Sequence, residues 1–529
     1  MSKYNRKKEI EKVPTLQGGV GVQMSDEHAL VGLLSTGLEG KFYEMEKTRE
    51  DRLKDLIRKV AKKDKYLVAQ MIVYTRTVFG QRSITHRAAV ELAKYLPGED
   101  WGKWFFSKWN KKENKGGVIF RLDDILEIAA CYKHFNKDAN LSNAIKKGFA
   151  MAIESADPYE IAKYQGKGKD VSLVDIVNLV HPNPSSKNAE ALKQLIAGNL
   201  KQFNTAEDKN TKSGQEVAKK VKAGKITKEE AKVELKEKKS ENWKALIGEG
   251  TIGYLSLLRN IKNIINTDAS LVESMCELLV DKRKVKESLV FPHQIDLALC
   301  ELESQGFDQQ TINRIQSTLS TAYEISVENV KELGMDAHTA VVYDTSGSMQ
   351  GKEGGYWGFP NASINGKESN YSPLNKASLI AATLAKGLGC DVYQFATTCE
   401  KVMYRAMDSV FSIKDKFRQM QGRVGHGTTF GSIFGKLDKP YNRIFIITDG
   451  QGNDSILKNS TFQSYKRQFG VNPYIYYVNL CGYDKLMFKE NERFFHIPGY
   501  SASIYELASK YEVDPKALIK EIRKIRIKY

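Results

Sequence analysis

The stretch "HTAVVYDTSGSMQG", residues 338–351, marks a change in the character of this chain. An apolar run, "AVVY", leads into the carboxylate Asp344, and two serines follow at alternate positions, Ser346 and Ser348. Short runs rich in β-branched and aromatic residues are typical of strands. The stretch therefore predicts a strand that ends in a tight turn carrying one carboxylate and two hydroxyl groups.

Three kinds of site use turns with such residues. A serine nucleophile at an elbow needs the pattern GxSxG and a histidine partner, whereas this turn reads DTSGS and has only His426 nearby. A phosphate-binding loop needs GxxxxGK followed by Ser or Thr, which is absent. One carboxylate and two hydroxyls suit a hard divalent cation such as Mg²⁺, which takes oxygen ligands and uses few carboxylates. A cation site is therefore favoured over a turn whose polar groups only cap local structure.

Further strand-like runs follow, namely "CDVYQFA", "RIFIITD" and "PYIYYVNLCG", and helical patterns separate them. Strands that alternate with helices indicate an α/β layer with a mostly parallel sheet. Ligand sites in such sheets collect at the carboxyl ends of the strands. Asp449 ends one of these runs, and "GHGTTFGSIF" offers Thr428 or Thr429 at a loop–helix junction. We expect these residues to complete a cation site with Asp344.

The chain before this sheet, from residue 20 to about 330, has a different period. In "EDRLKDLIRKVAKKDK", Leu53, Leu56, Ile57 and Val60 recur at helical spacing. Further stretches of about 12–18 residues repeat this pattern with short polar breaks. Many consecutive amphipathic helices without strands favour a HEAT-like helical array.

Length and charge limit the functions that this chain can have. The chain of 529 residues carries a formal net charge of +17, and 41% of its residues are hydrophobic. This length favours two or more domains. The positive charge is uneven, since residues 51–150 hold 21 Lys and Arg against 11 Asp and Glu. Either the protein has a polyanionic partner, most often nucleic acid, or its lysines serve only solubility.

Aromatic residues lie among these charges. The stretch "WGKWFFSKWNKKENKGG", residues 101–117, interleaves tryptophans and phenylalanines with lysines. Such a pattern can stack bases and pair phosphates. The alternative is a helix whose aromatic residues belong to the core and whose lysines are solvated, and the pattern alone favours that alternative.

Several classes of protein are disfavoured. The six cysteines are scattered without any CxxC pair, so neither a disulfide framework nor a zinc site is indicated. The basic N-terminus lacks the apolar stretch of a signal peptide, and no apolar run approaches the length of a membrane span. A cytoplasmic setting fits these features. The Lys- and Glu-rich stretch at 205–243 is predicted to be an exposed helical insertion or a flexible arm.

The pieces of the expected cation site occur in an order known from one protein family. DxSxS after a strand, GT before a helix and TDG after a later strand resemble the metal-ion-dependent adhesion site of von Willebrand factor A domains. The open coordination position of such a site takes an acidic residue of a partner, and a polar insertion at 351–372 departs from compact members of the family. The resemblance implies a divalent cation, with Mg²⁺ expected, held by Asp344, Ser346, Ser348, Thr428 and Asp449.

The helical part resembles a second family. "KYQGKGKDVSLVDIVNLVHPNPSS", "WKALIGEGTIGYLSLLRNI" and "VFPHQIDLAL" are similar to the TROVE module of the Ro 60 kDa autoantigen family. The resemblance implies a multidomain protein, in which an all-α, HEAT-like helical ring precedes an α/β, doubly wound von Willebrand A domain with a mostly parallel sheet. The implied boundaries are an N-terminal tail at 1–19, the ring at 20–336 with a Lys- and Glu-rich insertion at 205–240, the von Willebrand A domain at 337–510 and a basic C-terminal helix at 511–529.

The same resemblance implies RNA binding at particular residues. Family members bind Y RNAs and misfolded noncoding RNAs, whose single-stranded 3′ end threads the ring. Lys163, Lys167 and His181 match RNA-contacting positions, and Lys169 is a neighbour grouped with them. At position 167, lysine replaces a frequent arginine, which keeps the charge for phosphate contact but loses the bidentate fork. Without the family context, His181 would be interpreted as a helix-terminal or core histidine.

Three functions follow from these features. The favoured one is a monomeric, non-enzymatic Ro-type protein that binds Y-like and misfolded RNAs for quality control or as a ribonucleoprotein scaffold. An exoribonuclease or another protein is its expected partner, and no membrane contact is expected. The second is a metal-dependent protein-binding scaffold that does not bind RNA. The third, a Mg²⁺ nuclease at Asp344 and Asp449, is disfavoured because two-metal sites usually need more carboxylates.

Overall fold

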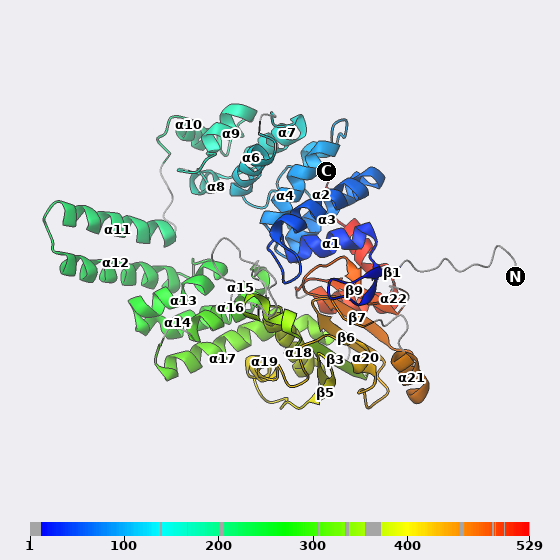
Figure 1. The fold of residues 1–529 in the computed structure, drawn as a ribbon. Coiled ribbons are helices and arrows are strands. Elements are labelled where there is room, and N and C mark those ends of the chain that lie inside the picture. The colour runs from blue at the N-terminus through cyan, green and yellow to red at the C-terminus, as the bar shows by residue number, and fades with distance from the viewer. Residues whose placement is uncertain are drawn as a thin grey trace. The chain divides into compact units, whose positions relative to one another are not determined.

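The computed structural model describes residues 12–137, 140–166, 168–200, 206–288, 290, 292–303, 306–333, 338–354, 372–454, 460–488, 491, 493–501 and 503–527. They belong to two compact units (Figure 1). The first unit comprises Met1–Phe120, Glu127–Gly148 and Asn329–Tyr529, and the second comprises Arg121–Leu126 and Phe149–Glu328.

A six-stranded sheet dominates the C-terminal part of the first unit. Its strand order is β5-β4-β3-β6-β7-β9, and neighbouring strands are parallel except β5, which is antiparallel to β4. The central strands β3 and β6 are buried along their whole length, as expected of parallel strands covered on both faces. The strands are β3 Thr339–Asp344, β4 Asp391–Phe395, β5 Cys399–Val402, β6 Arg443–Thr448, β7 Tyr474–Asn479 and β9 Phe494–Pro498.

Helices cover this sheet. The helix α18 (Pro373–Leu388) packs on β3 and β6. Local chemistry sets its ends, because Ser372 caps the first turn, Pro373 occupies the first helical position and Gly389 closes the helix with a φ of 64°. The other helices of this part are η5 Gly347–Gly354, α19 Val410–Gln419, α20 Gly431–Phe434, α21 Ser460–Phe469, α22 Ser503–Val513 and α23 Ala517–Arg523.

The N-terminal part of the first unit is helical. Consecutive helices pack against one another, and α1 also packs against β9 of the sheet. These helices are α1 Asp26–Thr36, α2 Glu46–Lys63, α3 Lys65–Val78, α4 Ser83–Leu92, η2 Ala93–Tyr95 and α5 Gly102–Phe105, while α6 Asp123–Phe135 and α7 Asn143–Glu154 extend into the second unit.

Both ends of the chain contribute to the first unit. The strands β1 (Lys12–Pro14) and β2 (Val20–Gln23) form a small antiparallel sheet with β8 (Lys485–Leu486). The described part of the predicted tail at 1–19 thus differs from a tail, because the backbone of residues 12–14 pairs with a neighbouring strand. This pairing joins the N-terminal segment to the sheet part.

The C-terminal segment packs on the N-terminal helices. The helix α23 contacts α3, and the Gln70 amide donates hydrogen bonds to the carbonyls of Arg523 and Ile525, at 3.0 Å and 2.9 Å. Ile525 and Ile527 are buried. The helix expected in 511–529 therefore ends in a segment that contributes apolar side chains to the core.

A fully buried arginine, Arg49 of α2, links the helical part to the sheet part. Its guanidinium donates to the carbonyl of Gly37, to the Thr36 hydroxyl and to Glu44 Oε2 at 2.8–3.1 Å. It also donates to the carbonyl of Cys481, at 2.9 Å. A buried guanidinium is stable only when its donors are satisfied, so Arg49 holds these segments together.

The second unit is entirely helical within its described residues. Its helices are α8 Pro158–Lys163, α9 Leu173–Val180, α10 Ala189–Ile196, α11 Ala206–Lys222, α12 Lys228–Gly248, α13 Tyr254–Thr267, η3 Ala269–Leu271, α14 Val272–Leu279, α15 Lys282–Glu287, α16 Pro292–Glu303 and α17 Gln309–Ser326, and η4 Glu328–Leu333 begins here. The helical part followed by an α/β part with a mostly parallel sheet confirms the predicted fold class.

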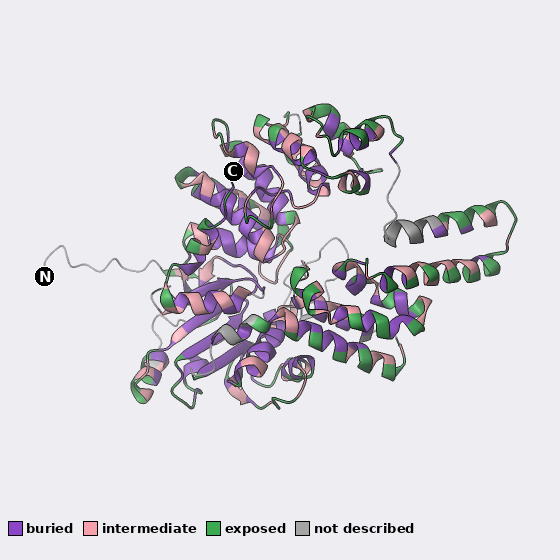
Figure 2. Ribbon diagram, turned by 180° about the vertical axis from the view of Figure 1, so that it is seen from behind, coloured by how far each residue is buried: buried purple, intermediate pink, exposed green. Residues whose placement is uncertain are grey.

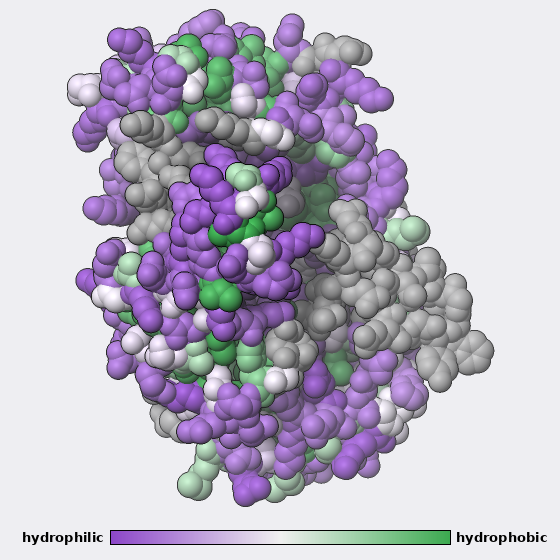
Figure 3. Space-filling model, turned by 90° about the vertical axis from the view of Figure 1, so that its left-hand side faces the viewer, coloured by the Kyte–Doolittle hydropathy of each residue, from purple (hydrophilic) through white to green (hydrophobic). Residues whose placement is uncertain are grey.

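The Lys- and Glu-rich insertion forms an antiparallel helix pair, α11 and α12 (Figure 1). Cross-helix ion pairs set its register, with Lys220 2.6 Å from Glu234 and Lys238 2.8 Å from Glu216. Figure 2 shows that much of this pair is exposed, whereas the sheet strands are buried. Hydrophilic side chains predominate on the face shown in Figure 3.

None of the described helices is long and apolar enough to cross a membrane.

Replacement of Arg49 is expected to destabilise the protein strongly. Arg49→Met leaves the buried carbonyls of Gly37 and Cys481 without donors, which should cost about 3–5 kcal/mol. Thermal unfolding measures the effect. The matched control is Lys47→Met on the same helix, where the side chain is 76% exposed and should tolerate the change. Equal unfolding midpoints for the two variants would contradict the role given to Arg49.

Candidate functional site

The carboxyl ends of β3 and β6 lie at one edge of the sheet, because these strands are parallel neighbours. Asp344 is the last residue of β3, and Asp449 directly follows Thr448, the last residue of β6. The Thr448 hydroxyl donates a 2.6 Å hydrogen bond to Asp344 Oδ2. The two carboxylates that the sequence assigns to a cation site therefore belong to one cluster.

The turn after β3 brings its serines to the same place. The Ser346 amide donates to Asp344 Oδ1 at 2.8 Å, and the hydroxyls of Ser346 and Ser348 are 3.3 Å apart. The Gly347 amide donates to the carbonyl of His426 at 3.0 Å. This last bond places the segment "GHGTT" beside the turn.

That segment offers two threonines, and their environments differ. Thr428 is fully buried, and its hydroxyl makes no hydrogen bond within the described residues. Its carbonyl accepts from the Asn453 amide at 3.0 Å, which holds it near the loop after β6. Thr429 is partly exposed, and its hydroxyl donates to Asn453 Oδ1 at 3.4 Å. Thr428 therefore has the hydroxyl suited to a ligand role.

Burial leaves two oxygen atoms of the cluster unsatisfied within the described part of the chain. One is the Thr428 hydroxyl, and the other is Asp449 Oδ2, whereas Asp449 Oδ1 accepts from the Gln451 amide at 3.1 Å. Buried polar atoms without partners are costly and call for an explanation. A hard cation would satisfy both atoms, and two carboxylates with three hydroxyls fit Mg²⁺.

The raised pKa values of the two buried carboxylates also favour a cation at this site. Burial raises the pKa of Asp344, as does the neighbouring Asp449 carboxylate. Burial also raises the pKa of Asp449, while the nearby Ser348 hydroxyl and the Gln451 amide lower it. No group of three or more His, Cys, Asp or Glu residues suited to a metal occurs in the described ranges. The hydroxyls are thus needed to complete a ligand set around these two carboxylates.

The loop at 37–45, between α1 and α2, lies beside this cluster. Burial and the carboxylates of Asp449 and Asp344 raise the pKa of Tyr43, while the nearby Ser348 hydroxyl lowers it. The Tyr43 amide donates to the Tyr483 hydroxyl at 3.2 Å. The sequence contains no signal for this contact, because the loop and the turn are far apart along the chain.

Lys41 of the same loop adds positive charge. Burial, together with the neighbouring cations Arg49 and Lys376, lowers its pKa to about 8. Both Lys41 and Asp449 shift the pKa of Cys481, so they share one neighbourhood. An anionic ligand at the cation position would therefore also be attracted by Lys41.

The residues assigned to RNA lie around α8 and α9 in the second unit. Lys163 is the exposed last residue of α8, and Lys169 is exposed in the following loop. The carbonyl of Gln165 accepts from the Leu173 amide at 2.9 Å, which folds this loop back onto the start of α9. Lys167 lies outside the described residues.

Lys163 is also close to two aromatic rings. Its Nζ lies 5.5 Å from the ring centroid of Tyr159 and 5.6 Å from that of Tyr164. Tyr159 is 43% exposed. No motif in the sequence marks these tyrosines, although the spacing of four residues from Tyr159 to Lys163 predicts a contact on a helix.

His181 ends α9 in a left-handed conformation, with φ 46° and ψ 63°, and its side chain is exposed. The turn after it is anchored, because the fully buried Asn188 donates to the carbonyls of Ile153 and Ala156, both at 3.0 Å. His181 is separated from the lysines by the length of α9, roughly 12 Å for eight residues. Lys163 and Lys169 thus lie before the first residue of α9, and His181 lies at its other end.

Comparisons with known proteins agree with this architecture. The model of the TROVE domain family matches residues 59–357. The solved structure of the Deinococcus radiodurans Ro (RSR) protein superposes with a TM-score of 0.54 at 17% identity, covering 95% of this chain and 100% of that chain. That likeness shows a common fold. No curated protein sequence matches the chain.

The family match covers more than half of the chain, including α8, α9 and the turn after β3. It confirms the resemblance that the motifs in the helical part indicate. The chain belongs to the TROVE domain family, the module of the Ro 60 kDa autoantigen family that the motifs of its helical part resemble.

Proposed function

We propose that this protein binds small noncoding RNAs, Y-like and misfolded, through basic and aromatic residues of its helical part. A single-stranded 3′ end is the segment that engages Lys163, Lys167, Lys169 and His181. The protein acts by binding and not by catalysis, as a monomer in the cytoplasm, in RNA quality control or as a ribonucleoprotein scaffold.

The observation that carries this proposal is the arrangement of Lys163 between Tyr159 and Tyr164. Single-stranded RNA is bound by phosphate neutralisation together with stacking of bases on aromatic rings. A lysine next to an exposed tyrosine supplies both interactions at one point. A lysine that served only solubility would not need aromatic neighbours.

His181 adds a second contact point. Residues other than glycine rarely adopt positive φ, and such conformations cluster at functional sites. Here the anchored turn holds the backbone while the imidazole remains exposed. With Lys163 near the other end of α9, a strand of several nucleotides can contact both.

We further propose that Asp344, Ser346, Ser348, Thr428 and Asp449 hold a divalent cation, most suitably Mg²⁺. The unsatisfied Thr428 hydroxyl and Asp449 Oδ2 support this assignment. When bound, the cation supplies an open coordination position for an acidic side chain of a protein partner, such as an exoribonuclease. The five ligands hold the cation in place. The positive charge of Lys41 adds attraction for an anionic side chain of the partner.

The second candidate function is a metal-dependent protein scaffold that does not bind RNA. The cationic neighbourhood of Lys41, Arg49 and Lys376 beside the two carboxylates favours it, because it suits an acidic protein segment. Nuclease activity remains disfavoured, since the cluster holds only two carboxylates.

Charge reversal at Lys163 is expected to weaken RNA binding. Lys163→Glu and His181→Ser should each reduce affinity for a hairpin RNA with a single-stranded 3′ tail by about tenfold or more, as expected for the loss of a stacking or phosphate contact. Gel-shift titration at two salt concentrations measures this. Lys262→Glu, an exposed charge reversal on α13 of the same unit, should have a much smaller effect.

If the wild type does not bind this RNA at low salt, the proposal that the protein binds RNA is wrong. If it binds and the Lys163 and His181 variants match Lys262→Glu, the assigned residues are wrong.

Metal binding is expected to stabilise the folded state. For the wild type, Mg²⁺ or Mn²⁺ at about 100 times its Kd should add about 2.7 kcal/mol, seen as a higher unfolding midpoint. Asp449→Asn should lose most of this increase, and it should raise the metal-free midpoint because one of two buried like charges is gone. Asp408→Asn, a partly exposed carboxylate of the same unit, is the control. Identical metal responses of wild type and Asp449→Asn would rule out the site.

A further inference from the structure

The aromatic residues of the basic stretch at 101–117 do not share one exposed surface. Phe105 and Phe106 are fully buried, and Trp109 stacks on Phe120 with ring centroids 5.6 Å apart. Trp104 is partly exposed and lines a cavity of about 670 Å³ in the first unit. The core interpretation therefore holds for the phenylalanines, while Trp104 has a different environment.

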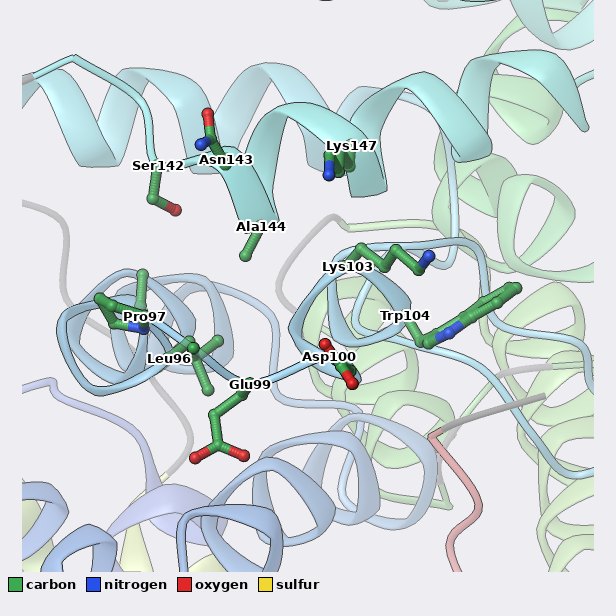
Figure 4. Close-up of a pocket in the computed structure, with 12 residues that line it drawn as sticks. Leu96, Pro97, Glu99, Asp100, Lys103, Trp104, Ser142, Asn143, Ala144 and Lys147 are labelled. Carbon is green, nitrogen blue, oxygen red and sulfur yellow. The ribbon is translucent and has the colours of Figure 1, made fainter.

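This cavity lies between the segment at 93–104 and the first turns of α7 (Figure 4). Two glycines allow these elements to approach closely. A Cβ on Gly102 would lie 3.2 Å from Ala144 Cβ, and one on Gly148 would lie 2.4 Å from Phe106 Cβ. Because α5 and α7 pack so tightly here, the cavity walls are fixed by backbone packing.

Two lysines from these helices face the same space. Figure 4 shows Lys103 of α5 and Lys147 of α7 near each other, with Trp104 beside Lys103. Lys103 Nζ lies 5.5 Å from the Trp104 ring centroid. Among the residues that the structure describes, neither lysine forms an ion pair with a carboxylate, so both charges remain for an anionic ligand.

The carboxylates near the cavity do not cancel this charge. Glu99 is already engaged, because Lys65 Nζ and Trp101 Nε1 each donate to it at 2.8 Å, and the pKa of Glu99 is lowered by these bonds. Asp100 is exposed and lies on the same side as Glu99 (Figure 4). It is available to accept a hydrogen bond from an amino group of a ligand.

The remaining wall holds the apolar residues Leu96, Pro97 and Ala144 together with the polar residues Ser142 and Asn143. Leu96 and Pro97 lie together on the side of the cavity away from the lysines, and Ala144 lies on α7 one turn before Lys147 (Figure 4). A cavity of this size is within the range of small-ligand sites, which combine apolar walls with a few polar groups. The complementary ligand has a flat, weakly polar part, an anionic part and a hydrogen-bond donor.

We propose that this cavity binds a nucleotide, with its phosphate between Lys103 and Lys147 and its base against Leu96, Pro97 and Ala144. Nucleoside phosphates combine the three chemical features that the walls require. The nucleotide is either a residue of a bound RNA strand or a free mononucleotide. Binding of a nucleotide within an RNA strand rests on the proposed function, whereas binding of a free mononucleotide does not.

Equilibrium dialysis of the full chain with adenosine 5′-monophosphate tests the pocket directly. Lys147→Glu should weaken binding about tenfold or more, and Lys103→Glu should do the same. Lys146→Glu is the matched control, since it makes the same charge change one residue away and does not line the cavity. His181→Ser should bind the mononucleotide like the wild type. Lys147→Gln, at an exposed position, keeps the test valid if a charge reversal disturbs folding.

Photocrosslinking identifies the source of the ligand. A tailed hairpin RNA with 4-thiouridine in its tail should crosslink to peptides from 93–104 or 142–147, and adenosine 5′-monophosphate should compete. Mononucleotide binding without such crosslinks assigns the pocket to free nucleotides, even if the RNA proposal fails.

Three results would overturn the inference. The first is the absence of both mononucleotide binding and crosslinks, while crosslinks to Lys163 persist. The second is equal binding by Lys147→Glu and Lys146→Glu. The third is competition by inorganic phosphate as strong as that by the mononucleotide, because the apolar wall would then contribute nothing.

Discussion

The first unit depends on the burial of one cation, the guanidinium of Arg49. Its donors are satisfied by Thr36, Gly37 and Glu44 of the helical part and by the carbonyl of Cys481 in the sheet part. A charge taken out of water at this depth is tolerated only with such a complete set of partners. Because the partners come from both parts, the N-terminal helices and the sheet form one unit.

This constraint also shapes the candidate metal site. The loop at 37–45 begins where Arg49 binds Gly37, and it brings Tyr43 to Ser348. The turn after β3 carries the candidate oxygen ligands, while the N-terminal loop carries the hydroxyl of Tyr43 and the largely buried cation Lys41. A ligand that approaches the metal position therefore meets both parts of the first unit. This arrangement couples the site to the packing of the helical part.

The residues proposed to bind nucleic acid are positioned differently from the candidate metal ligands. Lys163 and His181 are exposed on short helices of the second unit, where capping and an anchored turn set their directions. The nucleotide pocket in the first unit is instead built by close backbone packing at Gly102 and Gly148. Exposed lysines suit a flexible polyanion, because phosphate contacts tolerate many geometries. A pocket that joins cations to apolar side chains suits one nucleotide and can distinguish it from bare phosphate.

The sequence alone indicated the fold class, and the resemblance of its motifs to a known family supplied the five candidate metal ligands. Local patterns suffice for the fold class and for grouping Asp344 with Asp449, because strand and helix periods differ and the carboxyl ends of parallel strands meet at one edge of a sheet. Only the tertiary structure decided the positions of Tyr43, Arg49 and the Gly102 contact. These depend on backbone carbonyls and close approaches between segments distant in the chain, which leave no periodicity or motif in the sequence.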